Sequence, residues 1–256
     1  GARGADCKRS DGATIMSHIT RREAIGTGAV GAAGAMLVAG TSASAAQGAG
    51  AVTPVQAFAG KHTPQPLRFD PAKLTGLSER LITSHWENNY QGSVKALNTI
   101  ETRLAAAMAD PDFPPVAYSG LKREELHRTG SVVLHELYFG ALGGDGKPAG
   151  TIREALAAWF GGFDRWEAEF RRTAMSLAGG SGWCVLAYNR HTASLHNYWA
   201  WDHMHAPVNG APLITLDMYE HSYHMDYGTA AAKYIDAFMA NLHWEVIDAR
   251  YRAAIG

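Results

Sequence analysis

A carboxylate and an imidazole stand four residues apart near the C-terminal end of this 256-residue chain, and this pair constrains the fold more than any other feature. Asp217 directly follows the apolar run 212–216, and His221 lies between the aromatic residues Tyr219 and Tyr223. An anionic oxygen and a neutral nitrogen in partly dry surroundings make half of a transition-metal site. The fold must therefore bring further ligands to this point from elsewhere in the chain.

Two histidines far upstream, His85 and His135, stand in segments with helical character and can supply the other half of the site. Three imidazoles and one carboxylate suit a redox-active first-row metal such as iron or manganese. Such a set also leaves one coordination position for water and substrate. A lone histidine on a helix is more often a hydrogen-bonded core residue than a ligand, so the residue types alone leave both possibilities open.

The segment around Asp217 and His221 also resembles a known family. Residues 212–227, with the sequence PLITLDMYEHSYHMDY, resemble the Asp-x-Trp-Glu-His-Ala-Tyr signature of the iron/manganese superoxide dismutases. The similarity continues through 234–238 and 243–251; Ser181-Gly182-Trp183 looks like the family's Gly-Ser-Gly-Trp strand start, and 135–142 looks like its Asn-His-x-x-Phe-Trp helix. His85 precedes Leu97-Asn98 as the family's first ligand precedes its Leu-Asn pair. The resemblance covers residues 62–256 approximately.

The resemblance implies a defined metal site. His85, His135, Asp217 and His221 fall on the family's four ligand positions, which favours ligation over core packing. The resemblance implies one iron or manganese ion per subunit, without choosing between them, and the disproportionation of superoxide to oxygen and hydrogen peroxide. The expected partners are superoxide or another small molecule and further copies of the chain, in a homodimer or a dimer of dimers.

A further residue is expected to tune the metal. In the family, a Gln or a His holds the metal's solvent molecule, and hydrogen bonds of this kind tune a reduction potential. Counting forward from Trp183 puts His203 in that place, whereas counting backward from Asp217 puts Trp201 there. We expect His203, because an indole cannot accept a proton. A surface histidine in a loop is the alternative for His203.

Several positions depart from the family pattern. Ser93 stands eight residues after His85, where the family has a gateway tyrosine that relays protons, and Asn89 stands where the family often has a histidine. Tyr90, one helical turn before Ser93, can present a substitute hydroxyl or can simply pack in the core. Ser131 stands four residues before His135, at the other place from which some iron enzymes hold solvent, and a serine there removes that alternative. These changes bear on proton delivery and therefore on the rate of turnover.

Aromatic side chains are expected to wall the site and to exclude water, which strengthens electrostatic interactions inside it. The expected wall residues are Trp183, Tyr219, Tyr138, Phe139 and Trp244. The resemblance also implies that Glu220 crosses a dimer interface to the partner's His221, with Tyr223 at the same interface. A carboxylate on a ligating imidazole fixes its tautomer and raises its basicity. An exposed glutamate at a helix start is the alternative for Glu220.

Helix and strand signals predict an α+β fold, with an N-terminal α-helical hairpin domain followed by a C-terminal α/β domain with a three-stranded antiparallel sheet. Gly92 within the first long helix predicts a kink or a packing role. Helices are expected at 77–107 with Ser78 as cap, 121–142 with a turn near Gly130, 151–160 with a polar cap at or beside Thr151, 164–177 and 234–253; strands are expected at 183–188, 194–201 and 213–216.

The N-terminal region has the features of an export signal. Met16 is the expected start, and the pair Arg21-Arg22 precedes a Gly/Ala-rich apolar run to Ala39 and a small-residue cleavage site at 43–45. A paired arginine before a weakly apolar run indicates twin-arginine export, and hence a periplasmic or secreted protein. The run is shorter than the roughly 20 residues of a membrane span, so we expect no stable membrane anchor. A disordered apolar tail is the alternative.

Composition and loops complete the expected organisation. We expect a leader at 1–45, a linker at 46–65, a helical hairpin domain at 66–145 and a C-terminal domain at 146–256, with the glycine-rich loop 143–148 at the boundary. A formal net charge of −1 argues against nucleic acid as a partner. The chain has two cysteines, too few for a framework of disulfides. Cys7 falls in the expected leader, and Cys184 is expected to be a small buried hydrophobe.

The sequence supports three hypotheses of function. The first is an exported superoxide dismutase whose metal alternates between the +2 and +3 states. The second is a related metalloenzyme, an oxidase or oxygenase, whose altered gateway admits an organic substrate. The third is a metal-binding protein without turnover. A pocket beside Ser93 and Asn89 would favour the second hypothesis, because a dismutase needs only a narrow channel.

Overall fold

The computed structural model describes residues 55–256, so the expected export signal, its cleavage site and the first part of the linker lie outside the described residues. Ala51–Gly256 forms one compact unit. The expected division of this region near residue 145 stays a prediction. No helix within residues 55–256 is both long enough and apolar enough to cross a membrane.

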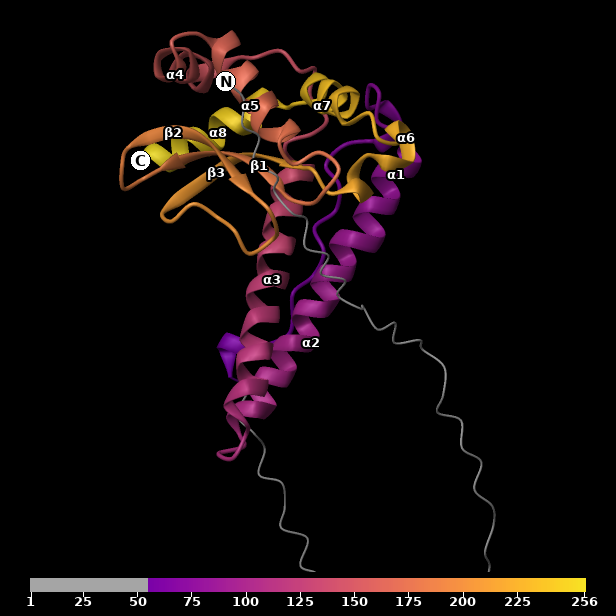
Figure 1. The fold of residues 1–256 in the computed structure, drawn as a ribbon, viewed down its shortest axis with the longest axis vertical. Helices are drawn as coiled ribbons and strands as arrows, with labels where there is room; N and C mark the ends of the chain where they lie inside the picture. Colours follow the sequence, from indigo (N-terminus) through magenta and orange to yellow (C-terminus); the bar gives the residue numbers. More distant parts are fainter. Residues whose placement is uncertain (1–54) are drawn as a thin grey trace, which may run out of the picture. The chain divides into compact units, whose positions relative to one another are not determined.

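A long helical hairpin forms one end of the molecule (Figure 1). Its first arm consists of α1 (Glu79–Ser84), a π-helical turn (His85–Tyr90) and α2 (Gln91–Met108). Its second arm is α3 (Pro115–Gly140), which begins with the proline that suits a first helical position. The predicted cap at Ser78 is confirmed, because its Oγ accepts a hydrogen bond from the Leu81 N–H at 3.0 Å.

The first arm is distorted earlier than the sequence indicated. The Gln91 N–H donates to the Trp86 carbonyl five residues before it, which is the pattern of a π-helical turn. This spacing buries both His85 and Tyr90, which lie five residues apart. The packing role expected at Gly92 is wrong, since a Cβ there would meet nothing within 4 Å among residues 55–256. The alternative expected there, a kink, stays a prediction. The irregular turn instead coincides with the first candidate ligand.

The turn expected near Gly130 is also wrong, because α3 continues through it without interruption. Gly130 serves a different purpose in the helix. A Cβ at this position would lie 1.8 Å from the carbonyl oxygen of His203. The missing side chain therefore lets the loop that carries His203 rest directly on α3.

The predicted three-stranded antiparallel sheet is confirmed, with the order β2-β1-β3. Its strands are β1 (Trp183–Asn189), β2 (Ser194–Ala200) and β3 (Gly210–Asp217). Strand β3 is longer than the expected 213–216. The register pairs Trp183 at the start of β1 with Asp217 at the end of β3 and with Ala200 at the end of β2. One end of the sheet therefore carries Trp183 of the expected aromatic wall, the candidate ligand Asp217 and the start of the loop that contains His203.

Further helices surround the sheet in the C-terminal half (Figure 1). They are α4 (Gly150–Phe160), α5 (Phe163–Met175), the short α6 (His224–Tyr227), α7 (Ala231–Ala240) and α8 (Trp244–Ile255). The polar cap expected at or beside Thr151 is wrong, because α4 has no cap of its own. Its Ile152 N–H instead donates to the Asp248 carboxylate of α8 at 2.9 Å.

The single helix expected at 234–253 is wrong, since α7 and α8 are separated at residues 241–243. The Asn241 side chain is buried and is fully used there. Its Nδ2 donates to the carbonyls of Ala237 and Thr75, and its Oδ1 accepts from the Thr75 N–H. These bonds tie the break to the segment before α1, which explains why the helix stops without a proline or glycine.

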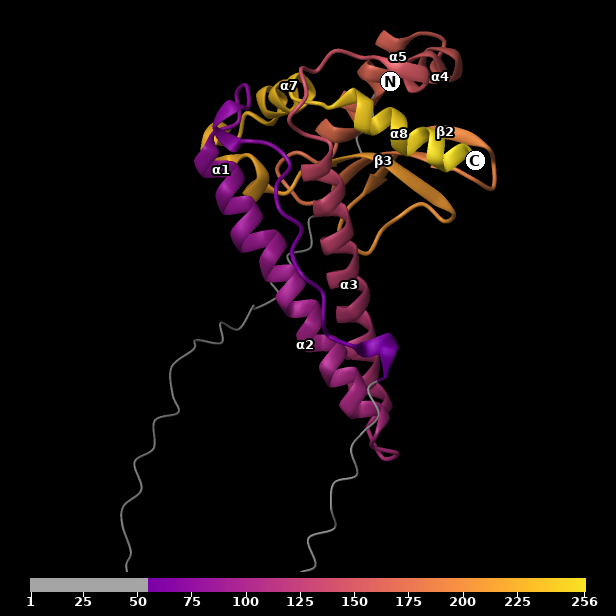
Figure 2. The same cartoon turned by 180° about the vertical axis from the view of Figure 1, so that it is seen from behind.

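An extended N-terminal segment runs along the helical hairpin (Figure 2). Its backbone is held by side chains of the first arm: Glu101 accepts from the Gly60 N–H, and Asn98 accepts from the His62 N–H. Further along, the Tyr90 hydroxyl accepts from the Gln65 N–H at 2.6 Å. The segment thus covers the side of the hairpin behind the π-helical turn. Cys184 is buried on β1, as predicted.

Candidate metal centre

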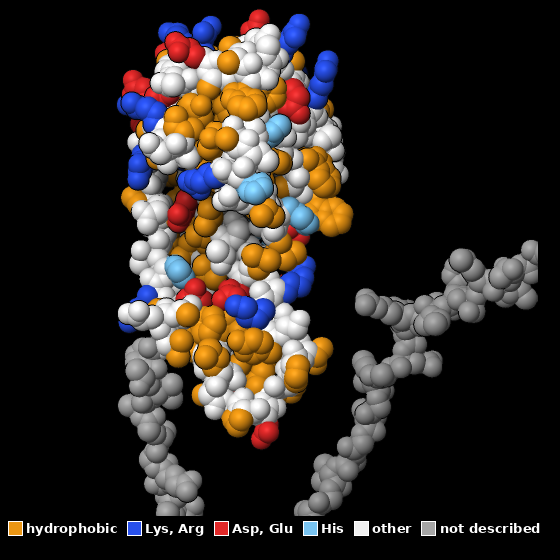
Figure 3. Space-filling model, turned by 90° about the vertical axis from the view of Figure 1, so that its left-hand side faces the viewer, with side chains coloured by type: hydrophobic (Ala, Val, Ile, Leu, Met, Phe, Trp, Pro, Cys, Tyr) orange, Lys and Arg blue, Asp and Glu red, His pale blue; other side chains and the backbone are white. Residues whose placement is uncertain are grey.

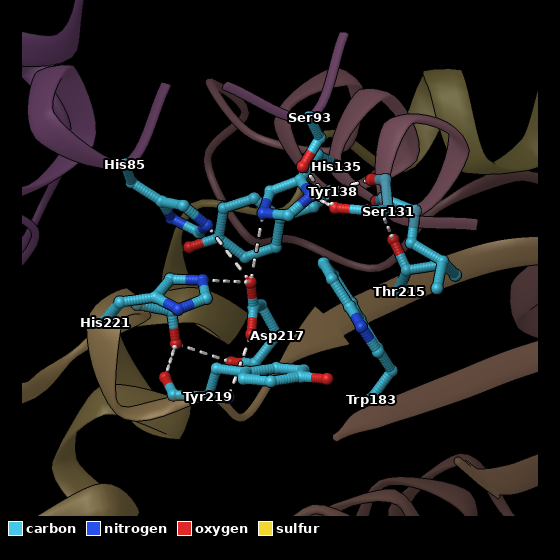
Figure 4. Close-up of polar contacts among 12 residues, drawn as sticks. His85, Ser93, Ser131, His135, Tyr138, Trp183, Thr215, Asp217, Tyr219 and His221 are labelled. Carbon is cyan, nitrogen blue, oxygen red and sulfur yellow. Dashed lines mark hydrogen bonds and ion pairs between the residues drawn. The ribbon is translucent and has the colours of Figure 1, made fainter. Parts of the chain in front are cut away.

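Four donor side chains from three parts of the chain meet at one point (Figure 4). The Nε2 atoms of His85, His221 and His135 lie 3.0, 3.2 and 3.5 Å from the same oxygen, Oδ2 of Asp217. One ligand atom from each of the four residues can be chosen so that all lie within 4.8 Å of one another. The π-helical turn supplies His85, α3 supplies His135, and the end of β3 with the turn after it supplies Asp217 and His221.

The spacing of these atoms fits a first-row metal. Donor atoms bonded to one ion at about 2.0–2.2 Å lie about 3.0 Å apart at right angles and about 3.4–3.6 Å apart at tetrahedral or trigonal angles. The observed 3.0–3.5 Å fall in this range. His135 Nε2 is buried and has no hydrogen-bond partner within residues 55–256, which is costly unless a ligand occupies that side. Three imidazoles with one carboxylate are a donor set for iron or manganese.

Hydrogen bonds outside the cluster fix two of the four ligands. His135 Nδ1 lies 2.7 Å from the Ser131 carbonyl, so it carries the proton and leaves the Nε2 lone pair facing the cluster. The second oxygen of Asp217 accepts from the Tyr219 N–H at 2.9 Å, which leaves Oδ2 for the cluster. Both ligands are therefore oriented before any ion binds.

Burial and charge set the protonation states that a metal requires. Burial lowers the pKa of His135 to about 3, and burial also lowers the pKa of His85, which keeps both rings neutral. Burial opposes the charge on Asp217, but His221 and His85 outweigh it and hold the pKa of this carboxyl well below its usual range. Burial likewise opposes the charge on His221, yet Asp217 raises its pKa overall. A metal ion would therefore compete with a proton for the His221 ring.

Two residues were candidates for holding the metal's solvent molecule. His203 lies beside the cluster, and Trp201 does not. The ring centre of His203 is 5.8 Å from that of His135, and the Trp183 Nε1–H donates to His203 Nδ1 at 2.9 Å. Burial lowers the pKa of His203 to about 4, so the ring is neutral with its proton on Nε2. Trp201 is exposed on the surface. Of the two positions weighed in the sequence, His203 is the one that lies beside the cluster.

Ser93, Tyr90 and Asn89, the positions discussed as departures from the family pattern, differ in burial and in hydrogen-bond partners. Ser93 is buried, and its Oγ lies 2.8 Å from Ser131 Oγ, which in turn lies 3.3 Å from His135 Nδ1. Tyr90 does not present a free hydroxyl beside Ser93. It donates to Glu136 at 2.7 Å and accepts from the Gln65 N–H, and burial raises the pKa of its phenol to about 12. Asn89 is half-buried.

The expected aromatic wall lies close around the ligands. Tyr138 and Phe139 have ring centres 5.2 and 5.1 Å from that of His85, and Trp183 lies 5.1 Å from His135. Tyr219 stacks on His221 at 5.3 Å. Trp244 contacts Phe163 and Trp166 under the C-terminal helices instead. It is therefore part of the core.

The two residues expected at a dimer interface differ in exposure. Glu220 is exposed in the isolated chain. A residue that contacts a second chain in a dimer has to be exposed in this way. Tyr223 is buried within its own chain, where it stacks on Tyr234 at 5.2 Å and its hydroxyl accepts from the Gly179 N–H. The Tyr223 ring thus already has a complete set of neighbours, and its position gives no support to an interface role.

The contacts of four residues near the centre were not predicted from the sequence. The Ser131 carbonyl orients His135, Glu136 holds the Tyr90 hydroxyl, Gly130 admits the His203 loop, and His127 packs against His203. Spacing on α3 offered one signal, because 127, 131 and 135 repeat every four residues and therefore share a helix face. Nothing in the sequence indicated the other contacts, which join distant segments.

Comparison with known proteins defines the class and then the family. The fold and the cluster define a metalloprotein with three histidine ligands and one aspartate ligand. A profile of the C-terminal domain of iron/manganese superoxide dismutases matches residues 148–250. A superoxide dismutase [Fe] of Cupriavidus metallidurans is 52% identical over 191 residues, which span 75% of this chain and 96% of the relative. The chain belongs to the iron/manganese superoxide dismutase family, as its sequence predicted.

More distant relatives carry either metal in their names. A superoxide dismutase [Fe] of Aquifex pyrophilus is 34% identical over 206 residues, which span 77% of this chain and 94% of the relative. A superoxide dismutase [Mn] 1 of Halobacterium salinarum is 32% identical over 194 residues, which span 74% of this chain and 94% of the relative. The match thus extends over nearly the whole length of each relative.

Proposed function

We propose that this protein is a superoxide dismutase that uses one iron or manganese ion, held by His85, His135, Asp217 and His221. The observation that carries this proposal is the convergence of three imidazole Nε2 atoms on one buried aspartate oxygen. When bound, the metal would take an electron from one superoxide and give it to the next, which with two protons yields one oxygen and one hydrogen peroxide. Three neutral imidazoles and one carboxylate leave the bound ion with net positive charge in both states, which favours an anionic substrate.

The surrounding residues restrict what reaches the metal. Tyr138, Phe139, Trp183 and Tyr219 pack close to the ligands and leave little room for an organic molecule. Ser93 is buried against Ser131, and the hollow on the neighbouring surface is lined by Gln91, Gly92 and Val94 and does not include Ser93 or Asn89. These contacts favour a small diatomic substrate over the organic substrate of an oxidase or oxygenase.

Two groups of polar residues can serve proton delivery. His203 carries a proton on Nε2 and lies beside the cluster, so it is suited to donate a hydrogen bond to solvent there. The hydroxyls of Ser93 and Ser131 form a second group that ends at His135 Nδ1. A serine hydroxyl is a poor acid, although it can order a water molecule. We therefore assign the solvent-holding role to His203 and a supporting role to the two serines.

A metal and turnover measurement on one sample tests the proposed function. The purified protein should contain about one iron or manganese per chain and should disproportionate superoxide at a rate that scales with metal content. His203→Ala should keep the metal, shift the reduction potential and reduce turnover by about 10–100-fold. A fully loaded protein without turnover would refute dismutation and leave a metal-binding role or another redox activity.

We also propose that two chains form a dimer through Glu220. Its carboxylate is exposed and directly precedes the ligand His221, so a symmetric contact could place it on the partner's His221. Glu220→Ala should weaken the dimer and lower metal retention together, measured by analytical ultracentrifugation and metal analysis. A monomeric wild-type protein with full metal content would contradict this assignment.

We further propose that the protein is exported in folded form. The pair Arg21-Arg22 before a weakly apolar run supports a twin-arginine signal, with cleavage near Ala45 and a mature chain that begins near Ala46. Replacing both arginines with lysine should retain the uncleaved protein in the cytoplasm, which cell fractionation and N-terminal sequencing measure. Unchanged export of the variant would exclude this route.

A further inference from the structure

His127 has no role in the proposed reaction, yet its ring contacts His203, the residue proposed to tune the metal. It lies on α3, eight residues before the ligand His135. Its ring meets that of His203 edge to face, with centres 4.9 Å apart and an angle of 72° between the planes. His127 itself is half-buried.

Three residues on one face of α3 lie at increasing distance along the helix from the ligand cluster. His127, Ser131 and His135 repeat every four residues and share one face of the helix. His135 touches Asp217, Ser131 supports His135, and His127 contacts the loop that carries His203. Gly130 lies on the same side, because the His203 carbonyl rests where its Cβ would be. The helix therefore binds the loop at both the backbone and the side chain of His203.

Three neighbours hold the His203 ring. Trp183 donates its indole N–H to Nδ1, and Tyr219 stacks on one face with ring centres 4.7 Å apart and an angle of 12°. His127 is the third neighbour and meets the ring edge to face. The first two neighbours stand on β1 and on the turn after β3, whereas His127 stands on the helix. Without His127, the ring would lose its nearer contact with the helical hairpin and keep only the one with His135, whose ring centre lies 5.8 Å away.

His127 is polar where packing alone would favour an apolar side chain. Its Nδ1 is buried and has no hydrogen-bond partner among the described residues. Burial and the neighbouring Arg128 lower the pKa of its imidazole, opposed by Glu124 and Asp202, so the ring is neutral at pH 7. An unpaired buried nitrogen is destabilising. Such a group is retained more readily at a functional site than in a plain core.

We propose that His127 is a positioning residue that acts through His203. It holds the His203 ring against Trp183 and Tyr219, and thereby fixes the direction in which His203 Nε2–H points beside the metal. The proposal rests on the proposed function, because it assumes that His203 tunes the metal. The other residues that hold the His203 ring, Trp183 and Tyr219, belong to the sheet and the turn after it, whereas His127 belongs to the helical hairpin.

Substitutions at His127, read out by spectroscopy as well as by turnover, test this inference. The iron-loaded holoenzyme is compared as wild type, His127→Leu, His127→Gln, His203→Ala and the double variant His127→Leu/His203→Ala. His205→Leu is the matched control, because His205 belongs to the same loop but contacts Trp201 and Asp202. Each variant is measured for iron content, the ferric electron paramagnetic resonance spectrum, the reduction potential and superoxide turnover.

We expect His127→Leu to keep its iron, to change the resonance spectrum and the potential, and to lower turnover about tenfold, the low end for residues outside the ligand set. His127→Gln should recover most of this loss because it restores a polar group, and His205→Leu should match the wild type. The double variant should equal His203→Ala within about twofold, since residues that act as a unit are not additive.

The alternatives separate cleanly. An unchanged spectrum and potential in His127→Leu would overturn the proposal, and so would a double variant whose losses multiply. If His203→Ala leaves the spectrum and the potential unchanged, the role proposed for His203 fails and the inference fails with it. A loaded wild type without turnover would refute dismutation. The positioning role would still stand if His127→Leu changed the spectrum of the wild type but not that of His203→Ala.

Discussion

Replacing Gly130 with alanine should disturb the metal centre although the residue touches no ligand. A Cβ at this position would lie 1.8 Å from the His203 carbonyl oxygen and 2.9 Å from its carbon, whereas real Cβ atoms stay beyond 3.0 Å. The loop or the helix must therefore move by at least 1.2 Å. The obstacle is backbone, which cannot rotate away as a long side chain can.

The size of the effect follows from two opposed contributions. Forcing a methyl group into a packed contact costs about 1–3 kcal/mol, and alanine in place of glycine within a helix regains about 1 kcal/mol. The free energy of unfolding should therefore fall by about 0–2 kcal/mol. Turnover should fall much more, because a misplacement of about 1 Å near a reacting centre can cost about 100-fold.

Gly120→Ala is the matched control, since Gly120 lies in the same helix and a Cβ there would meet nothing within 4 Å. It should stabilise the protein by up to about 1 kcal/mol and leave turnover unchanged. Urea unfolding and superoxide turnover at equal iron content measure both variants. If Gly130→Ala is stabilised as much as Gly120→Ala and retains full turnover, the His203 loop does not depend on its contact with α3.

Further expectations concern ligation, pH and proton delivery. His135→Ala should release the metal and lower the melting temperature of the loaded protein, because ion binding stabilises the folded state; an unchanged metal content would exclude His135 as a ligand. The pKa values of His135 and His203, lowered to about 3 and about 4, mean that the unfolded chain binds more protons below pH 6.5. The stability of the metal-free protein should therefore fall from pH 6.5 to pH 4, and His203→Gln should flatten this slope in urea unfolding. Ser93→Tyr should be tolerated or should raise turnover by supplying a better acid. Tyr90→Phe should lower stability by about 1–3 kcal/mol through the bonds lost at Glu136 and Gln65 while leaving turnover unchanged; total loss of activity in both variants with metal retained would favour the oxidase alternative.

The ligand set was accessible from the sequence because the segment around Asp217 and His221 resembles a family signature, and His85 and His135 fall on that family's other ligand positions. Two of the four ligands, Asp217 and His221, are close together in the chain, and the strand before Asp217 is plainly apolar. The sheet was predictable for a related reason, since three short apolar segments separated by turn residues fit no helix. The family and the α+β class followed from these segments.

Features that depend on one backbone approaching another were not accessible. Gly130 looked like a turn residue because a glycine in a helix is unfavourable, and only the position of the His203 carbonyl explains it. The break at Asn241 was hidden because its partners, Thr75 and Ala237, are known only once the fold is formed. Spacing allowed the Tyr90 hydroxyl either to serve near Ser93 or to pack in the core, and only the folded chain shows that Glu136 and the Gln65 N–H take it up. In each case a tertiary contact overrides the local pattern.

Strand β1 pairs with both of its neighbours at Trp183, which aligns the end of β3 and the end of β2 at the same level. Asp217 belongs to β3 itself, whereas His203 belongs to the loop between β2 and β3. An insertion or deletion in residues 201–209 would therefore move His203 while the sheet register keeps Asp217 in place. A change in the length of this loop could therefore alter redox tuning, and with it the metal preference, while the four ligands stay in place.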